Sequence, residues 1–315
     1  MTLRSYHLPM SAVTFGWDRT HEPLLVVPSG AEIVVDAAEC SNGQVGPDST
    51  AEAIATIDFA QVDPIAGPVF VEGARPGDAL QVDILDLELG SYGWSANYPG
   101  SGLLPEDFPD PWLYVWDISG PRAPYLGGIS VPLEPMVGIV GCTPAAPGPH
   151  SSIPPLRTGG NLDIKHIGIG TTIYLPVEVE GAGLGMGDAH AAQGDGEVGG
   201  SGIEAPMRIT ARVTVRRDLD IEQPEYEVRR PLERASAAAA GYYVTTGVGP
   251  DLFEASKTAV RRMIVRLERT RGLTPIEAYE LCSVALDLKI SEIVDYPNFV
   301  VSAFLPNDLF DGATV

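Results

Sequence analysis

Runs of apolar, β-branched residues predict strands along most of the chain. The first block covers residues 24–35 and 67–89, where Pro and Gly in VPSG and ARPGD supply the backbone angles of tight turns. A second block covers residues 131–141, 171–181 and 207–217. In the last of these, MRITARVTVRR, apolar and polar side chains alternate as they do in a half-buried strand. We therefore expect a predominantly β protein.

Two segments near the end of the chain predict helices. Residues 251–272 end on Gly272, a residue typical of a helix C-terminus. Residues 274–290 begin with Thr274 and carry Glu277 three positions later, the signature of a capping box. The expected fold class is thus α+β: two strand-rich blocks packed as a sandwich or barrel-like core, followed by late C-terminal helices.

The organisation into domains is less sharply marked. No composition break or repeat divides the chain, so we expect a single domain over residues 1–315, with two intimately packed β subdomains, about 1–140 and 141–315, as the alternative. Residues 90–127 are rich in Gly, Pro and aromatic residues and show no clean period. Such a segment predicts a long loop that covers a site.

Charge narrows the classes of partner. The sequence holds 42 acidic and 20 basic residues, a formal net charge of −22, so nucleic acid and anionic membrane surfaces would repel it. No apolar stretch is long enough to span a bilayer, and the N-terminal residues lack the apolar core of a signal peptide. Cys40, Cys142 and Cys282 are few and widely separated, as in a reducing compartment. We expect a cytoplasmic protein.

The stretch GDAHAAQGDGEVGGSGIE, residues 187–204, gathers carboxylates, a histidine and many glycines. Asp188 and His190 are two positions apart, and residues two apart on extended backbone share one face. Gln193, Asp195 and Glu197 repeat this spacing. Histidine with carboxylates suits Zn²⁺, whereas carboxylates alone suit Ca²⁺. A solvated acidic loop is the alternative interpretation.

A second polar set alternates in GGNLDIK, residues 159–165, which contains Asn161, Asp163 and Lys165. The chain has only three lysines, so a lysine placed beside a carboxylate here suggests a proton donor or an oxyanion stabiliser. A surface ion pair is the alternative. Other chemistry lacks support, because no cysteine has an evident base beside it and neither a phosphate-binding loop nor a G-x-S-x-G elbow occurs.

These motifs together resemble the acetamidase/formamidase family. The matching stretches are GPVFVEGARPGDALQVDILDLE, GIVGCTPAAPGPHSSIPPLRTGGNLDIKHI, TTIYLPVEVEGAGLGMGDAHAAQGDGEV and SVALDLKISEIVDYPNFVVSAFLPNDLF, which run from about residue 60 to the C-terminus. The chain departs from the family at Cys142, where a small residue such as alanine is expected, and across residues 90–127, which do not match closely. The second departure puts the exact substrate in doubt.

The resemblance implies hydrolysis of a carbon–nitrogen bond in a small linear amide, giving a carboxylate and ammonia, by a β-rich homo-oligomer. The family also includes enzymes that open lactams. Combining the resemblance with the spacing, we expect a bound divalent ion, with Zn²⁺ preferred and Ca²⁺ as the alternative. The expected metal ligands are Asp163, Asp188, His190 and Glu204; the catalytic groups are Glu197, Asp195 and Lys165; and the substrate-binding residues are Asn161 and Gln193.

Two other interpretations stay open at this point. In a metal-free mechanism, a carboxylate activates water and Lys165 acts as the acid. Alternatively, the chain is a non-catalytic protein that binds small amides or Ca²⁺.

Overall fold

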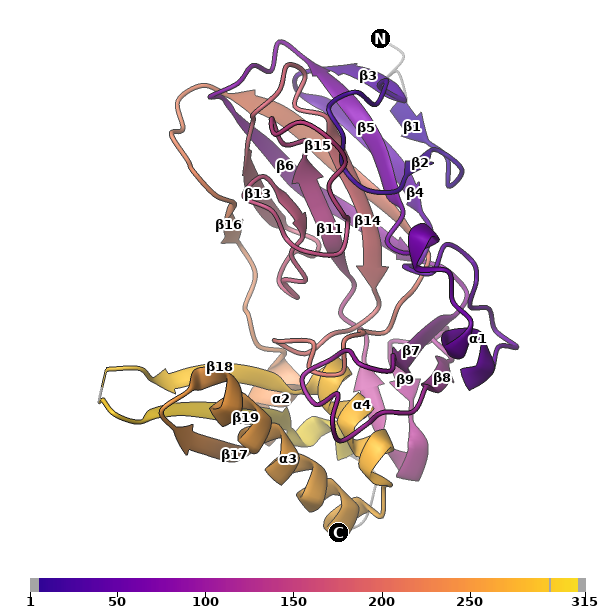
Figure 1. Cartoon of the computed structure of the whole chain (residues 1–315), viewed down its shortest axis with the longest axis vertical. Helices are drawn as coiled ribbons and strands as arrows, with labels where there is room; N and C mark the ends of the chain where they lie inside the picture. The colour runs from indigo at the N-terminus through magenta and orange to yellow at the C-terminus, as the bar shows by residue number, and fades with distance from the viewer. Residues whose placement is uncertain (1–5, 295, 311–315) are drawn as a thin grey trace.

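Two six-stranded sheets pack face to face and form a β sandwich (Figure 1). The computed structural model describes residues 6–294 and 296–310. The first sheet runs in the order β1 (Tyr6–Leu8), β4 (Ala31–Ala37), β15 (Met207–Arg216), β6 (Ala79–Leu89), β13 (Thr171–Pro176) and β16 (Glu225–Val228). The second runs in the order β12 (Gly159–Asn161), β11 (Met136–Cys142), β14 (Leu184–His190), β5 (Ile65–Glu72) and β2 (Val13–Thr14), and β3 (Leu25–Pro28) also pairs with β5.

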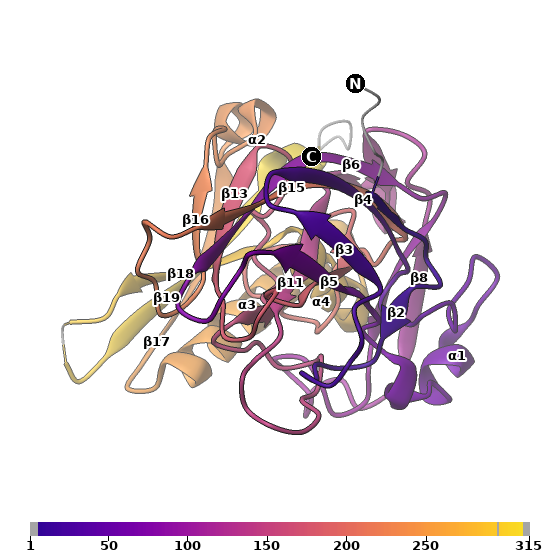
Figure 2. The same cartoon turned by 90° about the horizontal axis from the view of Figure 1, so that it is seen from above.

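The main hydrophobic core lies between the two sheets. Strand β15 buries alternate residues, as its sequence predicts, whereas β11 and β14 are buried along their whole length. Seen from above, the sheets form two arched layers, with β4 and β15 in one and β3 and β5 in the other (Figure 2). The sandwich that the sequence predicts is therefore confirmed.

A second lobe, called the helical lobe below, packs against one end of the sandwich (Figure 1). Its centre is the three-stranded sheet β17-β19-β18, which packs against α3. Two smaller strand pairs, β7 with β8 and β9 with β10, belong to the same lobe. The elements are α1 (Ala51–Ala55), η1 (Phe59–Gln61), β7 (Gly93–Asn97), β8 (Trp112–Trp116), β9 (Arg122–Pro124), η2 (Leu126–Gly128), β10 (Ser130–Pro132), α2 (Ala235–Ala240), β17 (Tyr242–Gly249), α3 (Leu252–Arg271), α4 (Pro275–Ala285), β18 (Asp287–Glu292), β19 (Phe299–Pro306) and η3 (Asn307–Phe310).

Both predicted helices form, and their ends follow local signals. Helix α3 ends at Gly272 in the left-handed conformation with φ 69°. Helix α4 begins at the capping box, where Glu277 accepts a hydrogen bond from the backbone N–H of Thr274 at 2.8 Å. The helix is shorter than expected, because residues 287–292 form β18 and pair with β19 instead.

The prediction of a loop at residues 90–127 is wrong. This segment contains β7, β8 and β9, and all five residues of β7 are buried. Aromatic side chains hold it in place: Phe108 stacks on Tyr279 of α4 with ring centroids 4.5 Å apart. The segment therefore consists of short strands joined by turns rich in glycine and proline, and it forms part of the helical lobe.

Strands from both sides of residue 140 alternate in the first sheet. Strand β15 lies between β4 and β6, and β6 in turn pairs with β13.

None of the described helices is long and apolar enough to cross a membrane.

Candidate active site

The end of β14 carries the central residues of the site, at the point where the sandwich meets the helical lobe (Figure 1). Asp188 and His190 are 4% and 1% exposed. Asp188 has a positive φ of 45°, and so do Asp63 (53°), Asp163 (46°) and Glu197 (41°). Such backbone angles are costly for residues other than glycine and gather where function requires them. The strain marks these four acids as one constellation.

The His190 ring is held between an amide and two carboxylates. Gln193 Nε2 donates to the carbonyl oxygen of Asp163 at 2.7 Å, so its Oε1 faces His190 Nδ1 at 2.6 Å. Because an amide oxygen only accepts, Nδ1 carries a proton and donates it. Nε2 then faces Asp188 Oδ1 at 3.3 Å and Glu204 Oε2 at 3.1 Å. Gln193 thus selects the ring nitrogen that is offered to the carboxylates.

The convergence of acids on one point shifts their pKa values strongly. Burial, followed by repulsion from Asp188, raises the pKa of Asp163 to about 7. Burial and the charges of Asp188 and Glu204 raise the pKa of Asp63 to about 9. Burial alone would lower the pKa of His190, but Glu204 and Asp188 outweigh it and raise that pKa well above its usual value. The cluster is therefore short of positive charge.

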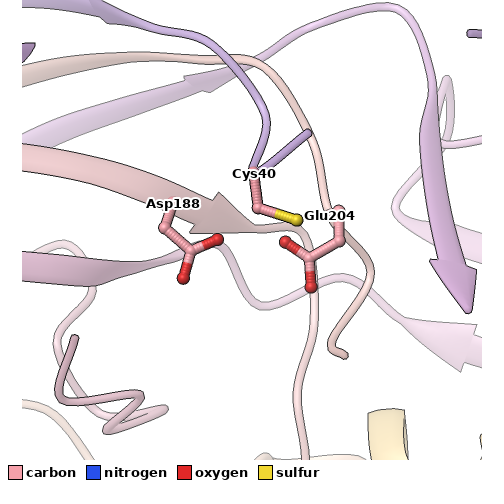
Figure 3. Close-up of side chains that lie close together, drawn as sticks. All are labelled: Cys40, Asp188 and Glu204. Carbon is pink, nitrogen blue, oxygen red and sulfur yellow. The ribbon is translucent and has the colours of Figure 1, made fainter. Parts of the chain in front are cut away.

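The donor atoms fit a divalent metal ion. Two groups of three residues could each hold an ion. In the first group, the possible ligand atoms of Cys40, Asp188 and Glu204 lie within 4.8 Å of one another. In the second group, the same is true of Asp163, His190 and Glu197. Figure 3 shows Cys40 Sγ and the carboxylates of Asp188 and Glu204 gathered around one point. Among the described residues, the buried oxygens Asp163 Oδ1 and Glu204 Oε2 have no hydrogen-bond partner, although Glu204 Oε2 lies 3.1 Å from His190 Nε2. Buried carboxylate oxygens without a hydrogen-bond donor suit a cation, and the mixture of N, O and S ligands suits zinc.

A glycine makes room for these ligands. A Cβ atom on Gly138 of β11 would lie 2.6 Å from Asp163 Oδ1 and 2.8 Å from Asp188 Oδ2. It would also lie 2.5 Å from the carbonyl oxygen of Asp188. The space beside the two carboxylates exists only because position 138 has no side chain.

Backbone bonds from the neighbouring lobe hold Glu204. Its N–H donates to the carbonyl oxygen of Trp94 at 2.7 Å, and its own carbonyl accepts from the Trp94 N–H at 3.0 Å. Its Oε1 accepts from the Gly202 N–H at 2.9 Å. Strand β7, inside the segment expected to be a loop, therefore positions a site carboxylate.

Lys165 and Asp195 belong to a second group. The ammonium of Lys165 is paired with Asp287 of β18 and lies 3.9 Å from Asp195 Oδ2. Asp287 also accepts from the backbone N–H of Asp195 at 3.1 Å. Asn161 makes its side-chain hydrogen bond outside both groups: its Nδ2 donates to the carbonyl oxygen of Ile153 at 3.1 Å. The nine expected site residues thus divide among the His190 cluster, the Lys165 pair and Asn161.

Sequence reasoning missed four contributors to the site. Cys40 was considered only as a nucleophile, and Asp63, Gly138 and Asp287 were not singled out. Asp287 lies in a segment expected to be helical, and Asp63 stands alone between apolar residues. The scarcity of lysine pointed to Lys165 but gave no sign of its partner.

Comparisons with known proteins agree on one family. The model of the Acetamidase/Formamidase family matches residues 11–151 and 145–312. The chain is 27% identical to a formamidase from Methylophilus methylotrophus over 94% of this chain and 88% of that protein. It is 31% identical to an acetamidase from Mycolicibacterium smegmatis over 58% of this chain and 61% of that protein.

Two solved structures extend the comparison to the fold. The gamma lactamase from Delftia acidovorans matches with a TM-score of 0.85 and 26% identity, covering 95% of this chain and 90% of that one. An acetamidase from Bacillus halodurans matches with a TM-score of 0.69 and 33% identity, covering 98% of this chain and 100% of that one.

A buried histidine surrounded by several carboxylates supplies the proton-transfer groups and the metal ligands with which hydrolases activate water. The chain belongs to the Acetamidase/Formamidase family, which confirms the resemblance found in its motifs. It is an amidase, a hydrolase that acts on carbon–nitrogen bonds. This assignment favours the enzyme over the non-catalytic alternative.

Proposed function

We propose that this amidase hydrolyses small linear amides such as formamide or acetamide to the carboxylate and ammonia. The observation that carries the proposal is the convergence of Asp163, Asp188, Glu197 and Glu204 on His190, with two buried carboxylate oxygens that accept no hydrogen bond from the described residues. The names of the relatives support the class of substrate, and the lactamase likeness adds small lactams to the candidates.

We further propose that the cluster holds a divalent ion, with Zn²⁺ preferred because a ring nitrogen stands among the ligands and the thiol of Cys40 lies beside them. Ca²⁺ is the alternative, because oxygen atoms are in the majority. Asp188, His190, Glu204 and Asp163 are the protein ligands in this proposal, with Cys40 beside them. When bound, the ion lowers the pKa of water and polarises the amide carbonyl.

The remaining side chains have distinct tasks in this proposal. Burial first, and then Asp163, raise the pKa of Glu197 well above its usual value, so its carboxyl can hold a proton near neutral pH. In its ionised form Glu197 takes a proton from the attacking water, and the protonated carboxyl, which the raised pKa favours, delivers that proton to the departing nitrogen. Lys165, held by Asp287 and Asp195, supplies positive charge at the rim, where the tetrahedral intermediate carries negative charge.

The decisive experiment is an amide panel on metal-analysed protein. Ammonia release is measured from formamide, acetamide and propionamide, and ring opening from a γ-lactam, before and after chelation and after reloading with Zn²⁺ or Ca²⁺. We expect chelation to abolish turnover and one of the two ions to restore it. His190→Ala should lose bound metal and rate together. Full activity of the metal-free protein would instead support the carboxylate mechanism with Lys165 as the acid.

The expected setting of the enzyme is the cytoplasm. All three cysteines are buried and free, which supports a reducing compartment. A homo-oligomer is expected from the family resemblance.

A further inference from the structure

A wide groove runs along the helical lobe between α3 and the outer edge of β17. Its volume is about 790 Å³. The side chains of one α3 face form one wall, and residues 243–246 of β17 form the other. The groove lies away from the amidase site: none of the expected site residues lines it.

Arginines dominate the helical wall. Arg262, Arg266 and Arg269 follow one another at spacings of four and three, so they share one helix face. None of the three has a carboxylate within ion-pair distance among the described residues, whereas their neighbour Arg261 is paired with Glu106 and Asp107. In a chain of net charge −22, three arginines that lack a carboxylate partner among the described residues form a rare positive surface in this groove, and one of them, Arg266, lies 3.3 Å from the ring centroid of Tyr243 on the opposite wall.

The strand wall of the groove is an open sheet edge. Among the described strands, β17 pairs only with β19, so the backbone groups on its other side have no strand partner in this part of the chain. Large apolar side chains are exposed around it: Tyr243 is 42% exposed, Val265 50% and Val248 62%. An unpaired edge with apolar and cationic side chains suits an extended acidic segment of another protein chain.

The chain itself carries such a segment in β16. This strand lies at the edge of the first sheet, where it pairs with β13, and no other described strand pairs with its outer edge. Glu225, Tyr226 and Glu227 are exposed on it, and Glu222 precedes it. Strands β16 and β17 both lie toward the left side of the molecule in Figures 1 and 2.

We propose that the groove between α3 and β17 receives the acidic edge strand β16 of a second copy of this chain. Because both surfaces lie on one side of each protomer, a two-fold axis can form the contact twice, each groove receiving the partner strand. A groove-to-groove dimer is disfavoured, because it would bring like charges together.

Charge reversal tests the proposal through the dimer dissociation constant, measured by analytical ultracentrifugation or mass photometry. We expect the wild-type chain to dimerise, and potassium chloride to weaken the dimer. The variants R262E/R266E and E222K/E225K should each raise the dissociation constant about tenfold or more, and the chain that carries all four changes should recover the wild-type value. A matched control, R19E/R75E, changes the net charge as much as R262E/R266E does, at exposed positions outside the groove, and should leave the constant unchanged.

Cross-linking gives a second, independent measurement. All native cysteines are buried, so Thr246→Cys on one chain and Glu225→Cys on another should form a disulfide across the interface when the two variants are mixed and oxidised. A monomer at all concentrations would overturn the proposal. A dimer insensitive to both reversals, or one that the combined variant does not restore, would overturn it as well. Amidase activity in either case leaves the proposed function intact.

Discussion

At the scale of single residues, Gln193 decides how His190 acts. The amide donates to the Asp163 carbonyl and accepts from Nδ1, which leaves Nε2 for the carboxylate side of the cluster. Removing such an orienting partner typically costs about 10–100-fold in metal affinity or activity. We expect Gln193→Ala to show this loss in bound metal per chain and in kcat/KM, with an unchanged far-UV spectrum. If Gln193 acted only by contacting substrate, KM would rise while metal content stayed constant.

Gly138 supports a second prediction at this scale. An added methyl group at position 138 would lie within 2.8 Å of three oxygen atoms of Asp163 and Asp188. Gly138→Ala should therefore displace these carboxylates and lower metal content and turnover together. Gly46→Ala is the matched control, because a Cβ there meets nothing within 4 Å. Metal content equal to that of the wild type would mean that the carboxylates at Gly138 are not ligands.

At the scale of elements, helix α4 carries a buried acid that opposes folding at high pH. Glu280 is 0% exposed, and neither of its carboxylate oxygens has a hydrogen-bond partner among the described residues. Burial raises the pKa of Glu280 well above its usual value. The unfolded chain releases this proton above about pH 4.3, whereas the folded chain keeps it, so stability falls as the pH rises from that value toward the folded pKa.

Glu280→Gln removes this pH dependence while keeping the shape of the side chain. We expect the variant to be more stable than the wild type in urea at pH 8, and the difference to shrink near pH 4.5, where the unfolded wild type also binds the proton. The exposed residue Glu88 provides a control, since Glu88→Gln should give no such trend. An equal difference at both pH values would show that Glu280 is ionised in the folded protein.

Elements were predictable from the sequence wherever their signals are local. The capping box at Thr274 and the αL glycine Gly272 fix helix ends within one turn, and alternation fixes β15. The end of α4 was misplaced, because apolar spacing in ALDLKI fits either a helix or a strand, and only pairing with β19 decides.

In the site, too, contacts set by local spacing could be predicted from the sequence, and contacts set by tertiary packing could not. The spacing of Asp188 and His190 predicted their contact, which is 3.3 Å between Asp188 Oδ1 and His190 Nε2, although the positive φ of Asp188 departs from the extended backbone that the prediction assumed. It failed for Asp195 and Glu197, because the positive φ of Gly196 and of Glu197 turns the chain, so that one acid faces Lys165 and the other faces His190. The partners from distant segments, such as Cys40 and Asp287, are brought in by tertiary packing, which local spacing does not encode.

At the scale of the whole molecule, the chain folds as interleaved strands. In the first sheet, β15 lies between β4 and β6, so each side of residue 140 supplies the hydrogen-bond partners of the other. In the second sheet, β14 pairs with β5 and with β11. The alternative organisation, two subdomains of about 1–140 and 141–315, would leave these strands with open edges and half of a core.

Expression of the two fragments separately tests this organisation. We expect residues 1–140 alone and residues 141–315 alone to lack a cooperative thermal transition and to give poorly dispersed amide NMR spectra, because each loses the neighbours of its central strands. When the two fragments are refolded together, the transition should return, since every strand pair can re-form. A cooperative transition in either isolated fragment would support two subdomains, each with a core of its own, whose strands interleave only after both have folded.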